Sequence, residues 1–348
     1  MAKKIKAGVV GTGIIGKSHI RGYKGMDEVE IVAVADIDKE EAQQVAKEYE
    51  IPNVFTDYHD LLKLDLDTVD VCLPNFLHSP VTIAALESGK HVYCEKPMAR
   101  TGDEAQAMWD AAKRTGKLLA IQLGTLYSKD TKAAKNLITE GKLGNLYYAK
   151  TSHYRRRGRV YVDGYATPHF VQKEKSGGGT LADMAVYHMA RMVWLLGNPE
   201  LDTVTGFTYQ ELPMDEKRRK ESGYNVEELG IGLVHFKNNA TMFVEESWAI
   251  HAPGGEGDRL YGNKGGLRIE PLTLFHDVDG KHTDTELNAD ELLGDYAGPG
   301  YDGSQKHFVW SVLGCVQPID TASIALKVAK ITSAMYKSAE TGRQVAFE

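Results

Sequence analysis

Cysteine is scarce in this sequence. Its 348 residues include three cysteines, Cys72, Cys94 and Cys315, and no two of them form a CxxC pair. Three thiols at these spacings cannot build the disulfide framework that is typical of small secreted proteins. The opening residues, 1–6, also pass straight into a strand-like run without an apolar leader segment. We therefore expect the chain to work in the reducing cytoplasm.

Long apolar runs and an excess of positive charge are also absent. No stretch approaches the roughly 18 to 20 apolar residues that a membrane-spanning helix needs, and the formal net charge is −7. Proteins that bind nucleic acids usually present a basic face to the phosphates. We therefore expect neither a membrane nor a nucleic acid as partner. The histidines show no metal-ligand spacing such as HExxH, so no metal site is predicted.

What the sequence does contain is a glycine-rich turn between a strand and a helix. The apolar run 5–10 is followed at once by Gly11, Thr12, Gly13, Ile14, Ile15 and Gly16, and then by a segment with helical character. The GxGxxG pattern in this setting is typical of dinucleotide binding. Its first glycine permits the tight turn, the second lets the backbone approach a pyrophosphate, and the third lets helix and strand pack closely.

An acidic residue stands at the distance that this fingerprint requires. A second strand-like run, 31–35, ends at Asp36, and Ile37 and Asp38 follow with no basic residue. A carboxylate at this position accepts hydrogen bonds from the adenosine ribose and repels the 2′-phosphate of NADP. The sequence therefore predicts NAD as the cofactor.

The strand–helix unit repeats through the first third of the chain. Further strands are predicted at 54–55, 69–73, 91–94 and 118–123, alternating with helices at 39–49, 80–88 and 101–115. This alternation predicts an α/β fold with a doubly wound parallel sheet, in which ligands bind beyond the carboxyl ends of the strands. The residues expected at those ends are Leu73, Pro74, Asn75, His78, Glu95, Lys96 and Gln122.

Three further motifs resemble one enzyme family. The segment 89–99 contains Glu95-Lys96-Pro97 and resembles the EKP signature of the glucose–fructose oxidoreductase, inositol dehydrogenase and rhizopine catabolism protein family (Gfo/Idh/MocA). Residues 73–78 are similar to its TPNxxH segment, and residues 176–183 to its GGGxLxD segment. The resemblance implies an NAD-dependent oxidoreductase of sugar-like substrates.

The same resemblance implies a second, α+β domain with an open, mostly antiparallel sheet. Strands are predicted for it at 146–154, 203–210, 230–236, 240–248 and 258–261, and a late helix at 320–339. We expect a Rossmann domain at 1–124 and a substrate-binding and oligomerisation domain at 125–348. Because an open sheet leaves an apolar face bare, a homodimer or homotetramer is predicted.

Lys96 is the predicted proton-handling residue. It follows a parallel strand at the edge where the nicotinamide should lie, and the family resemblance assigns the corresponding lysine to the reacting hydroxyl. A lysine has a reference pKa of about 10.4, so it becomes a base near neutral pH only if its surroundings lower that pKa. Without the motif, the alternative is a surface lysine paired with Glu95.

Asp183 and the residues after it form the second predicted catalytic group. Residues 180–196 are predicted to form one helix, on which Tyr187 lies four residues after Asp183 and shares its face. His188 comes one residue later, about 100° around the helix. Family members carry His or Tyr at the fourth position, whereas proton chemistry near neutral pH favours histidine. Both residues remain candidates, and the domains are expected to bring this group and Lys96 to one substrate.

A basic run gives the sequence its most individual feature. Arginines at 155–157 follow Tyr154, and if the strand continues through them, Arg155 and Arg157 share one face. They are candidates for binding an anionic substrate group, with intersubunit ion pairs or a solvated loop as the alternative. The further candidates for substrate contact are Tyr154, His169, in a loop, and Tyr127, which stands where many relatives carry arginine.

Three functions follow from these motifs. The first is a reversible NAD-dependent dehydrogenase of a sugar, cyclitol or glycoside. The second is a glycoside-cleaving enzyme that uses NAD only transiently, through oxidation, elimination and return of the hydride. The third is a non-catalytic NAD-binding sensor, which would have no need to retain Lys96 and Asp183.

Overall fold

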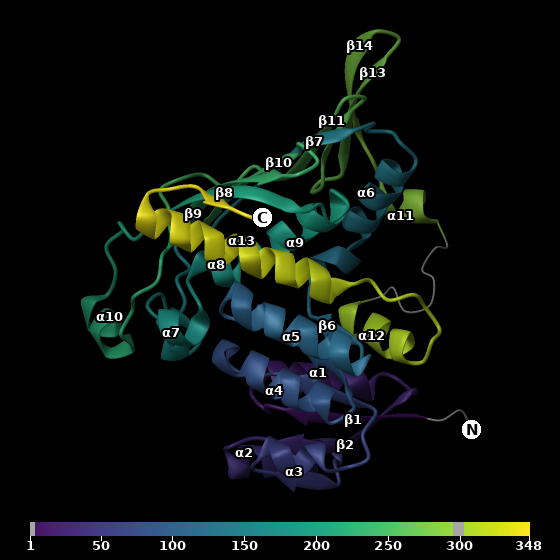
Figure 1. Ribbon diagram of the computed structural model, residues 1–348, viewed down its shortest axis with the longest axis vertical. Coiled ribbons are helices and arrows are strands. Elements are labelled where there is room, and N and C mark those ends of the chain that lie inside the picture. The colour runs from purple at the N-terminus through teal and green to yellow at the C-terminus, as the bar shows by residue number, and fades with distance from the viewer. Residues whose placement is uncertain (1–3, 295–302) are drawn as a thin grey trace. The chain divides into compact units, whose positions relative to one another are not determined.

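The computed structural model describes residues 4–294 and 303–348, and these form two compact units. The first unit contains residues 4–99, 103–122 and 303–326, and the second contains residues 100–102, 123–294 and 327–348. Figure 1 shows both units as ribbons. None of the described helices has the length and apolar character needed to cross a membrane.

The first unit is built on a six-stranded sheet in the order β3-β2-β1-β4-β5-β6. All of its neighbouring strands pair in parallel. The strands are β1 (Ile5–Val10), β2 (Val29–Ala35), β3 (Asn53–Phe55), β4 (Thr68–Val71), β5 (His91–Cys94) and β6 (Leu119–Ile121). This order reverses direction between β1 and β4, and it confirms the predicted doubly wound fold, whose ligand site is expected at that reversal.

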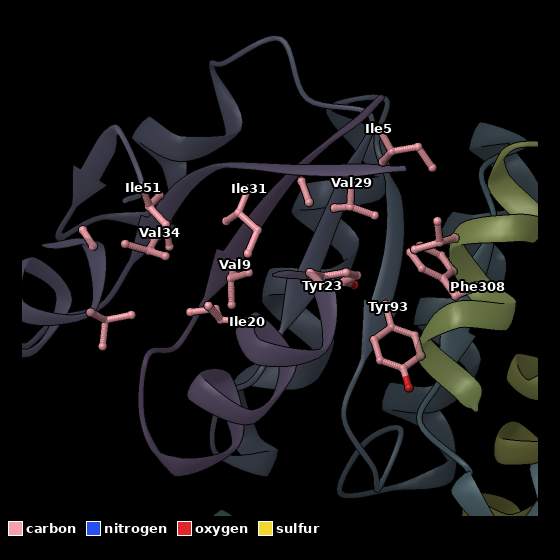
Figure 2. Packing of buried hydrophobic residues seen from close by; sticks show 14 of the residues in the cluster. Ile5, Val9, Ile20, Tyr23, Val29, Ile31, Val34, Ile51, Tyr93 and Phe308 are labelled. Carbon is pink, nitrogen blue, oxygen red and sulfur yellow. The ribbon is translucent and has the colours of Figure 1, made fainter. Parts of the chain in front are cut away.

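Helices connect these strands, and one more arrives from the far end of the sequence. They are α1 (Ile14–Lys24), α2 (Lys39–Tyr49), α3 (Tyr58–Leu62), α4 (His78–Glu87), α5 (Gly102–Thr115) and α12 (Ser304–Val312). In α12, Phe308 and Val309 are buried in the same apolar cluster as Tyr23 and Tyr93 (Figure 2). The predicted boundary at residue 124 placed this helix in the second domain, whereas its side chains complete the core of the first unit.

The second unit is built on a nine-stranded sheet in the order β14-β13-β12-β11-β7-β10-β9-β8-β15. Its pairs are antiparallel except β7 with β10, which is parallel. The strands are β7 (Leu146–Tyr154), β8 (Leu201–Tyr209), β9 (Leu229–Phe236), β10 (Thr241–Ser247), β11 (Gly257–Gly262), β12 (Gly266–Arg268), β13 (Thr273–Val278), β14 (Lys281–Glu286) and β15 (Val345–Ala346). The predicted mostly antiparallel sheet is confirmed.

One face of this sheet is covered by helices. The second unit contains the helices α6 (Lys129–Thr139), α7 (Lys173–Ser176), α8 (Thr180–Asp183), α9 (Ala185–Leu195), α10 (Glu216–Ser222), α11 (Ala289–Leu293) and the part of α13 (Thr321–Thr341) from residue 327 onward. Helix α9 packs against β7, β10 and β11, and we call this helix-covered side the inner face. On the outer face, the side chains of Phe207, Tyr209 and Leu233 are 51%, 41% and 50% exposed.

One local prediction was wrong: the single helix expected over residues 180–196 is divided into α8 and α9, with Met184 between them. The strand predicted at residues 146–154 is confirmed by β7. Because β7 ends at Tyr154, the condition that the strand continues through the arginines is not met, and the alternation of faces does not apply to Arg155 and Arg157.

Candidate functional site

The glycine turn after β1 has the geometry that a dinucleotide requires. Gly11 has a φ of +95°, and a Cβ added to it would lie 2.2 Å from the carbonyl oxygen of Cys72. A Cβ on Gly16 would lie 2.0 Å from the carbonyl oxygen of Gly11, whereas one on Gly13 would meet nothing within 4 Å. The first and third glycines are therefore needed for packing, and the second keeps space open beside the N-terminus of α1, where backbone N–H groups attract phosphate.

Asp36 is held beside this turn by its own hydrogen bonds. Its Oδ2 accepts from the backbone N and the Oγ1 of Thr12, at 2.7 and 3.1 Å, and its Oδ1 accepts from the backbone N of Asp38 at 3.0 Å. A carboxylate has about four acceptor positions, so one remains for a ribose hydroxyl. The buried Thr12 thus fixes the residue predicted to select NAD.

Exposed apolar groups and one unsatisfied polar atom surround the same strand ends. Ile14 is 85% exposed, Ile15 48% and Ile37 94%, and bare apolar surface of this kind suits the flat rings of a dinucleotide. The Oε1 of Gln122, directly after β6, is buried without a hydrogen-bond partner. An amide N–H donor such as the nicotinamide carboxamide would satisfy it. These features fit NAD.

The turns after β4 and β5 are joined by a buried histidine. His78 is fully buried, and its Nδ1 and Nε2 each lie 2.7 Å from a carbonyl oxygen, of Pro97 and Leu73 respectively. The segment from Leu73 through Pro74 to the buried Asn75 is thereby fixed against the turn that carries Lys96. These residues lie at the carboxyl edge of the sheet, as predicted.

Lys96 lies in a turn whose backbone is held by its neighbour. Its backbone N donates to the Oε2 of Glu95 at 3.0 Å, and the Lys96–Pro97 peptide bond is cis. The other carboxylate oxygen of Glu95 lies 3.0 Å from the Nε2 of His19. Glu95 therefore orients the Lys96 backbone, which the sequence alone did not indicate.

In the second unit, Asp183 lies at the end of α8 and accepts a hydrogen bond from the indole nitrogen of Trp248 at 3.2 Å. Trp248 is fully buried in an apolar cluster, so it belongs to the core of this unit. Glu246 is also fully buried, and neither of its carboxylate oxygens has a hydrogen-bond partner. Burial, followed by the charge of Asp258, raises the pKa of Glu246 well above its ordinary value.

His188 belongs to an internal polar cluster. Its ring stacks on that of His153 with centroids 3.4 Å apart, and its Nδ1 lies 3.5 Å from the Oδ2 of Asp258. That oxygen also accepts from Arg191 at 2.8 Å, and the Oδ1 of Asp258 lies 2.9 Å from the Nε2 of His153. Burial lowers the pKa of His188 despite the carboxylate. Sequence analysis missed the partners of His188 because they are brought together only by the sheet.

The other predicted substrate contacts are scattered. Tyr154 and His153 are adjacent in β7 and point to opposite faces, so Tyr154 lies on the outer face with Glu245. Burial and Glu245 raise the pKa of Tyr154 to about 12. The outer face is opposite to the one that carries Trp248 and Glu246, and this position does not favour a shared role with Asp183. Tyr127 is buried at the end of a short 3-10 helix, and the carbonyl of Tyr187 accepts from Thr125.

The basic run divides into exposed and buried arginines. Arg155 donates to the hydroxyl of Tyr165 at 2.5 Å, and Arg157 is exposed. His169 was predicted in a loop, but it lies in a short 3-10 helix (Pro168–Val171), where it is exposed and its Nδ1 lies 3.1 Å from the ammonium of Lys175. The fully buried residue is Arg159, which pairs with Glu228 at 2.9 Å and with Asp163 at 3.1 Å. The last arginine of the run is therefore structural.

Two clusters of the described residues have ligand atoms close enough for a metal ion: His19, Asp70 and Cys72, and His153, His188 and Asp258. Neither suits a cation. Both ring nitrogens of His19 face carboxylates, and in the second cluster the imidazoles are stacked while Arg191 occupies the carboxylate. Imidazole lone pairs lie in the ring plane, so stacked rings do not converge on one ion.

Comparison with known proteins agrees with this geometry. Residues 5–123 match the model of the oxidoreductase family with an NAD-binding Rossmann fold, and residues 131–268 match the GFO/IDH/MocA C-terminal domain. The chain belongs to the Gfo/Idh/MocA oxidoreductase family. It is an NAD-dependent oxidoreductase, and the sequence-based prediction of family and cofactor is confirmed.

Individual relatives differ in how much of the chain the likeness covers. The D-glucoside 3-dehydrogenase of Escherichia coli is 29% identical over 98% of this chain and 97% of its own length. The inositol 2-dehydrogenase of Salmonella typhimurium is 33% identical over 58% of this chain and 56% of its own. A levoglucosan dehydrogenase solved with NADH and levoglucosan shares the fold, with a TM-score of 0.78, 23% identity and 99% coverage of both chains.

Proposed function

We propose that this enzyme oxidises a secondary ring hydroxyl of a glucoside, reversibly and with NAD. The observation that carries the proposal is the full-length likeness to a D-glucoside 3-dehydrogenase together with a lysine held at the carboxyl end of β5. When bound, NAD accepts the hydride from the carbon. The protein must supply a group for the hydroxyl proton and contacts that orient the sugar.

Lys96 is proposed to handle the proton. The turn after β5 is fixed on both sides, by Glu95 at the backbone of Lys96 and by His78 at the carbonyl of Pro97. A fixed turn limits the positions open to the amine, and orientation is a large part of catalytic power. Gly13, Asp36 and Gln122 are proposed to hold the pyrophosphate, ribose and carboxamide of NAD.

Asp183 and Tyr187 are proposed to hold the sugar. Asp183 is oriented by the hydrogen bond that it accepts from Trp248, and a carboxylate is a suitable acceptor for sugar hydroxyls. His188 is the less suitable of the two candidates, because it is stacked on His153 and its Nδ1 faces Asp258 inside the unit. We therefore assign direct contact with the substrate to Tyr187 and a supporting role to His188.

Absorbance at 340 nm during turnover tests the reaction class. The purified enzyme would be incubated with NAD and a panel of glucosides, free sugars, cyclitols and uronates. We expect NADH to accumulate in proportion to a keto-glycoside product. Release of free sugar without net NADH would instead establish transient oxidation followed by elimination, and no reaction with any glucoside would refute the proposed substrate class.

We also propose that the enzyme forms a homodimer or homotetramer through the outer face of the nine-stranded sheet. Phe207 and Tyr209 of β8 and Leu233 of β9 expose a large part of their side chains there. The register pairs Phe207 with Ile231 and Thr205 with Leu233, so these residues form one continuous stripe. Apolar stripes of this kind usually become buried in an interface.

A further inference from the structure

A chain of buried charges lies below the turn that carries Lys96. His19 of α1 is 8% exposed, and its Nδ1 lies 3.1 and 3.0 Å from the two carboxylate oxygens of Asp70, a residue of β4 that is 1% exposed. Its Nε2 lies 3.0 Å from the Oε1 of Glu95. The other oxygen of Glu95 accepts from the backbone N of Lys96. Three elements of the first unit therefore meet at one imidazole.

The geometry fixes the protonation state of His19. A carboxylate only accepts hydrogen bonds, and a neutral imidazole has one N–H, so it can donate to one carboxylate and not to two. Both contacts are satisfied only when the ring carries a proton on each nitrogen. Burial alone would lower the pKa of His19, but the charge of Asp70 and the hydrogen bonds to Asp70, Cys72 and Glu95 raise it well above its ordinary value.

We infer that His19 is a positioning residue for Lys96: as a permanent imidazolium it joins Asp70 to Glu95, through Glu95 it fixes the backbone of the Lys96 turn, and it sets the net charge of the cluster to which that backbone is bonded. The inference rests on the proposed role of Lys96 in proton transfer. Two carboxylates and one imidazolium leave a net charge of −1. Replacing His19 or Glu95 by a neutral residue changes that net charge and, with it, the balance between ammonium and amine at Lys96.

The surroundings of His19 contain no second cation among the described groups that contact it. The thiol of Cys72 lies 3.3 Å from its Nδ1, and burial raises the pKa of that thiol, so the sulfur stays protonated. The ring of Tyr93, on β5, lies 5.5 Å away between centroids, and Gln305 of α12 donates to the His19 carbonyl at 3.1 Å. The ionised groups that face the imidazolium are therefore Asp70 and Glu95.

Nitrogen NMR of the cofactor-free protein tests the charge state directly. With histidine labelled by ¹⁵N, His19 should show two protonated ring nitrogens, unchanged between pH 6 and pH 9, and the signal should be absent from His19→Gln. In Glu95→Gln the Nε2 resonance should shift, because its acceptor is no longer charged. A neutral His19 ring, or a ring that titrates near its ordinary pKa, would overturn the inference.

The pH profile of kcat tests the link to Lys96. His19→Gln leaves Glu95 without its counter-charge, so the pKa of the lysine should rise. The acidic limb of the profile for alcohol oxidation, which requires the neutral amine as base, should therefore move up by about one pH unit. Glu95→Gln should move the limb down, and the double variant should return it toward the wild-type position. His19→Gln should also lower kcat by about tenfold through lost orientation, with the Kd for NAD within about threefold of wild type.

His91→Gln is the matched control. His91 lies at the opposite end of β5, where its Nδ1 accepts from the backbone N of Leu118 at 2.9 Å. Its replacement should leave the position of the pH limb unchanged. If folded His19→Gln and the wild type have this limb of the kcat profile at the same pH, the positioning role is overturned. If Lys96→Ala keeps normal turnover, the proposed function of Lys96 fails, while the NMR result still decides the state of His19.

Discussion

Asp36→Asn removes one negative charge from the nucleotide site and retains an oxygen that Thr12 can donate to. A 2′-phosphate carries about 1.5 to 2 negative charges at neutral pH. At about 5 Å from a carboxylate and an effective dielectric constant of about 20, each unit of that charge is repelled by about 3 kcal/mol. Asp36 is only partly buried, so solvent screening reduces the effect, and we expect a preference for NAD of roughly 10 to 100-fold.

Initial rates with NAD and NADP give kcat/KM for each, and their ratio measures this preference. We expect Asp36→Asn to lower the ratio by about 10 to 100-fold, mainly by improving the use of NADP. Asp38→Asn is the matched control, because Asp38 caps α2 by accepting from the backbone N of Glu41 and lies two residues away. A wild-type enzyme that uses NADP as well as NAD, or an unchanged ratio in Asp36→Asn, would refute the reasoning.

Lys96→Ala should lower kcat by about 100-fold or more, the usual size of a general acid–base contribution, with NAD affinity by calorimetry within a few-fold; near-normal turnover would exclude the proton role. Tyr187→Phe should raise the KM for the substrate, whereas His188→Ala should mainly lower the melting temperature, and the reverse pattern would exchange the two roles. Leu233→Glu should shift the mass measured by light scattering toward the 38.4 kDa monomer, while an unchanged mass would place the interface elsewhere. Arg159→Met breaks a buried ion pair and should lower the free energy of unfolding by about 3 to 5 kcal/mol, as measured by urea denaturation; a loss below 1 kcal/mol would contradict its structural role.

The first unit was readily predicted because its signals are local. Each parallel strand is a short apolar run, and Gly11 and Gly16 stand where backbone contacts exclude any side chain. The edge of the second sheet was missed because β14 has the sequence Lys-His-Thr-Asp-Thr-Glu, which contains no apolar residue to alternate. A strand held mainly by backbone pairing with β13 leaves no hydrophobic pattern to find.

The site residues divide in the same way, into those marked by a local motif and those brought together only by the fold. Lys96 and Asp183 lie in motifs that can be read within a few residues of sequence. The contact of His19 with Glu95 spans 76 residues, and that of His153 with Asp258 spans 105. No spacing rule connects residues so far apart, because His19 reaches Glu95 from helix α1 and His153 reaches Asp258 through the pairing of β7 with β11. Arg159 was overlooked for a related reason: its position in a basic run suggested solvent, whereas its burial depends on Glu228.

The position of α12 has a consequence for how the protein is made. Phe308 and Val309 fill the core of the first unit beside Tyr23 and Tyr93 (Figure 2), yet a ribosome adds them about 200 residues after β6. Until then the nascent nucleotide-binding unit exposes the apolar surface that they will cover, and nearly the whole of the second unit is synthesised in the meantime. A fragment cut after residue 124 should therefore bind chaperones or aggregate, and grafting α12 onto it by a linker should restore its solubility.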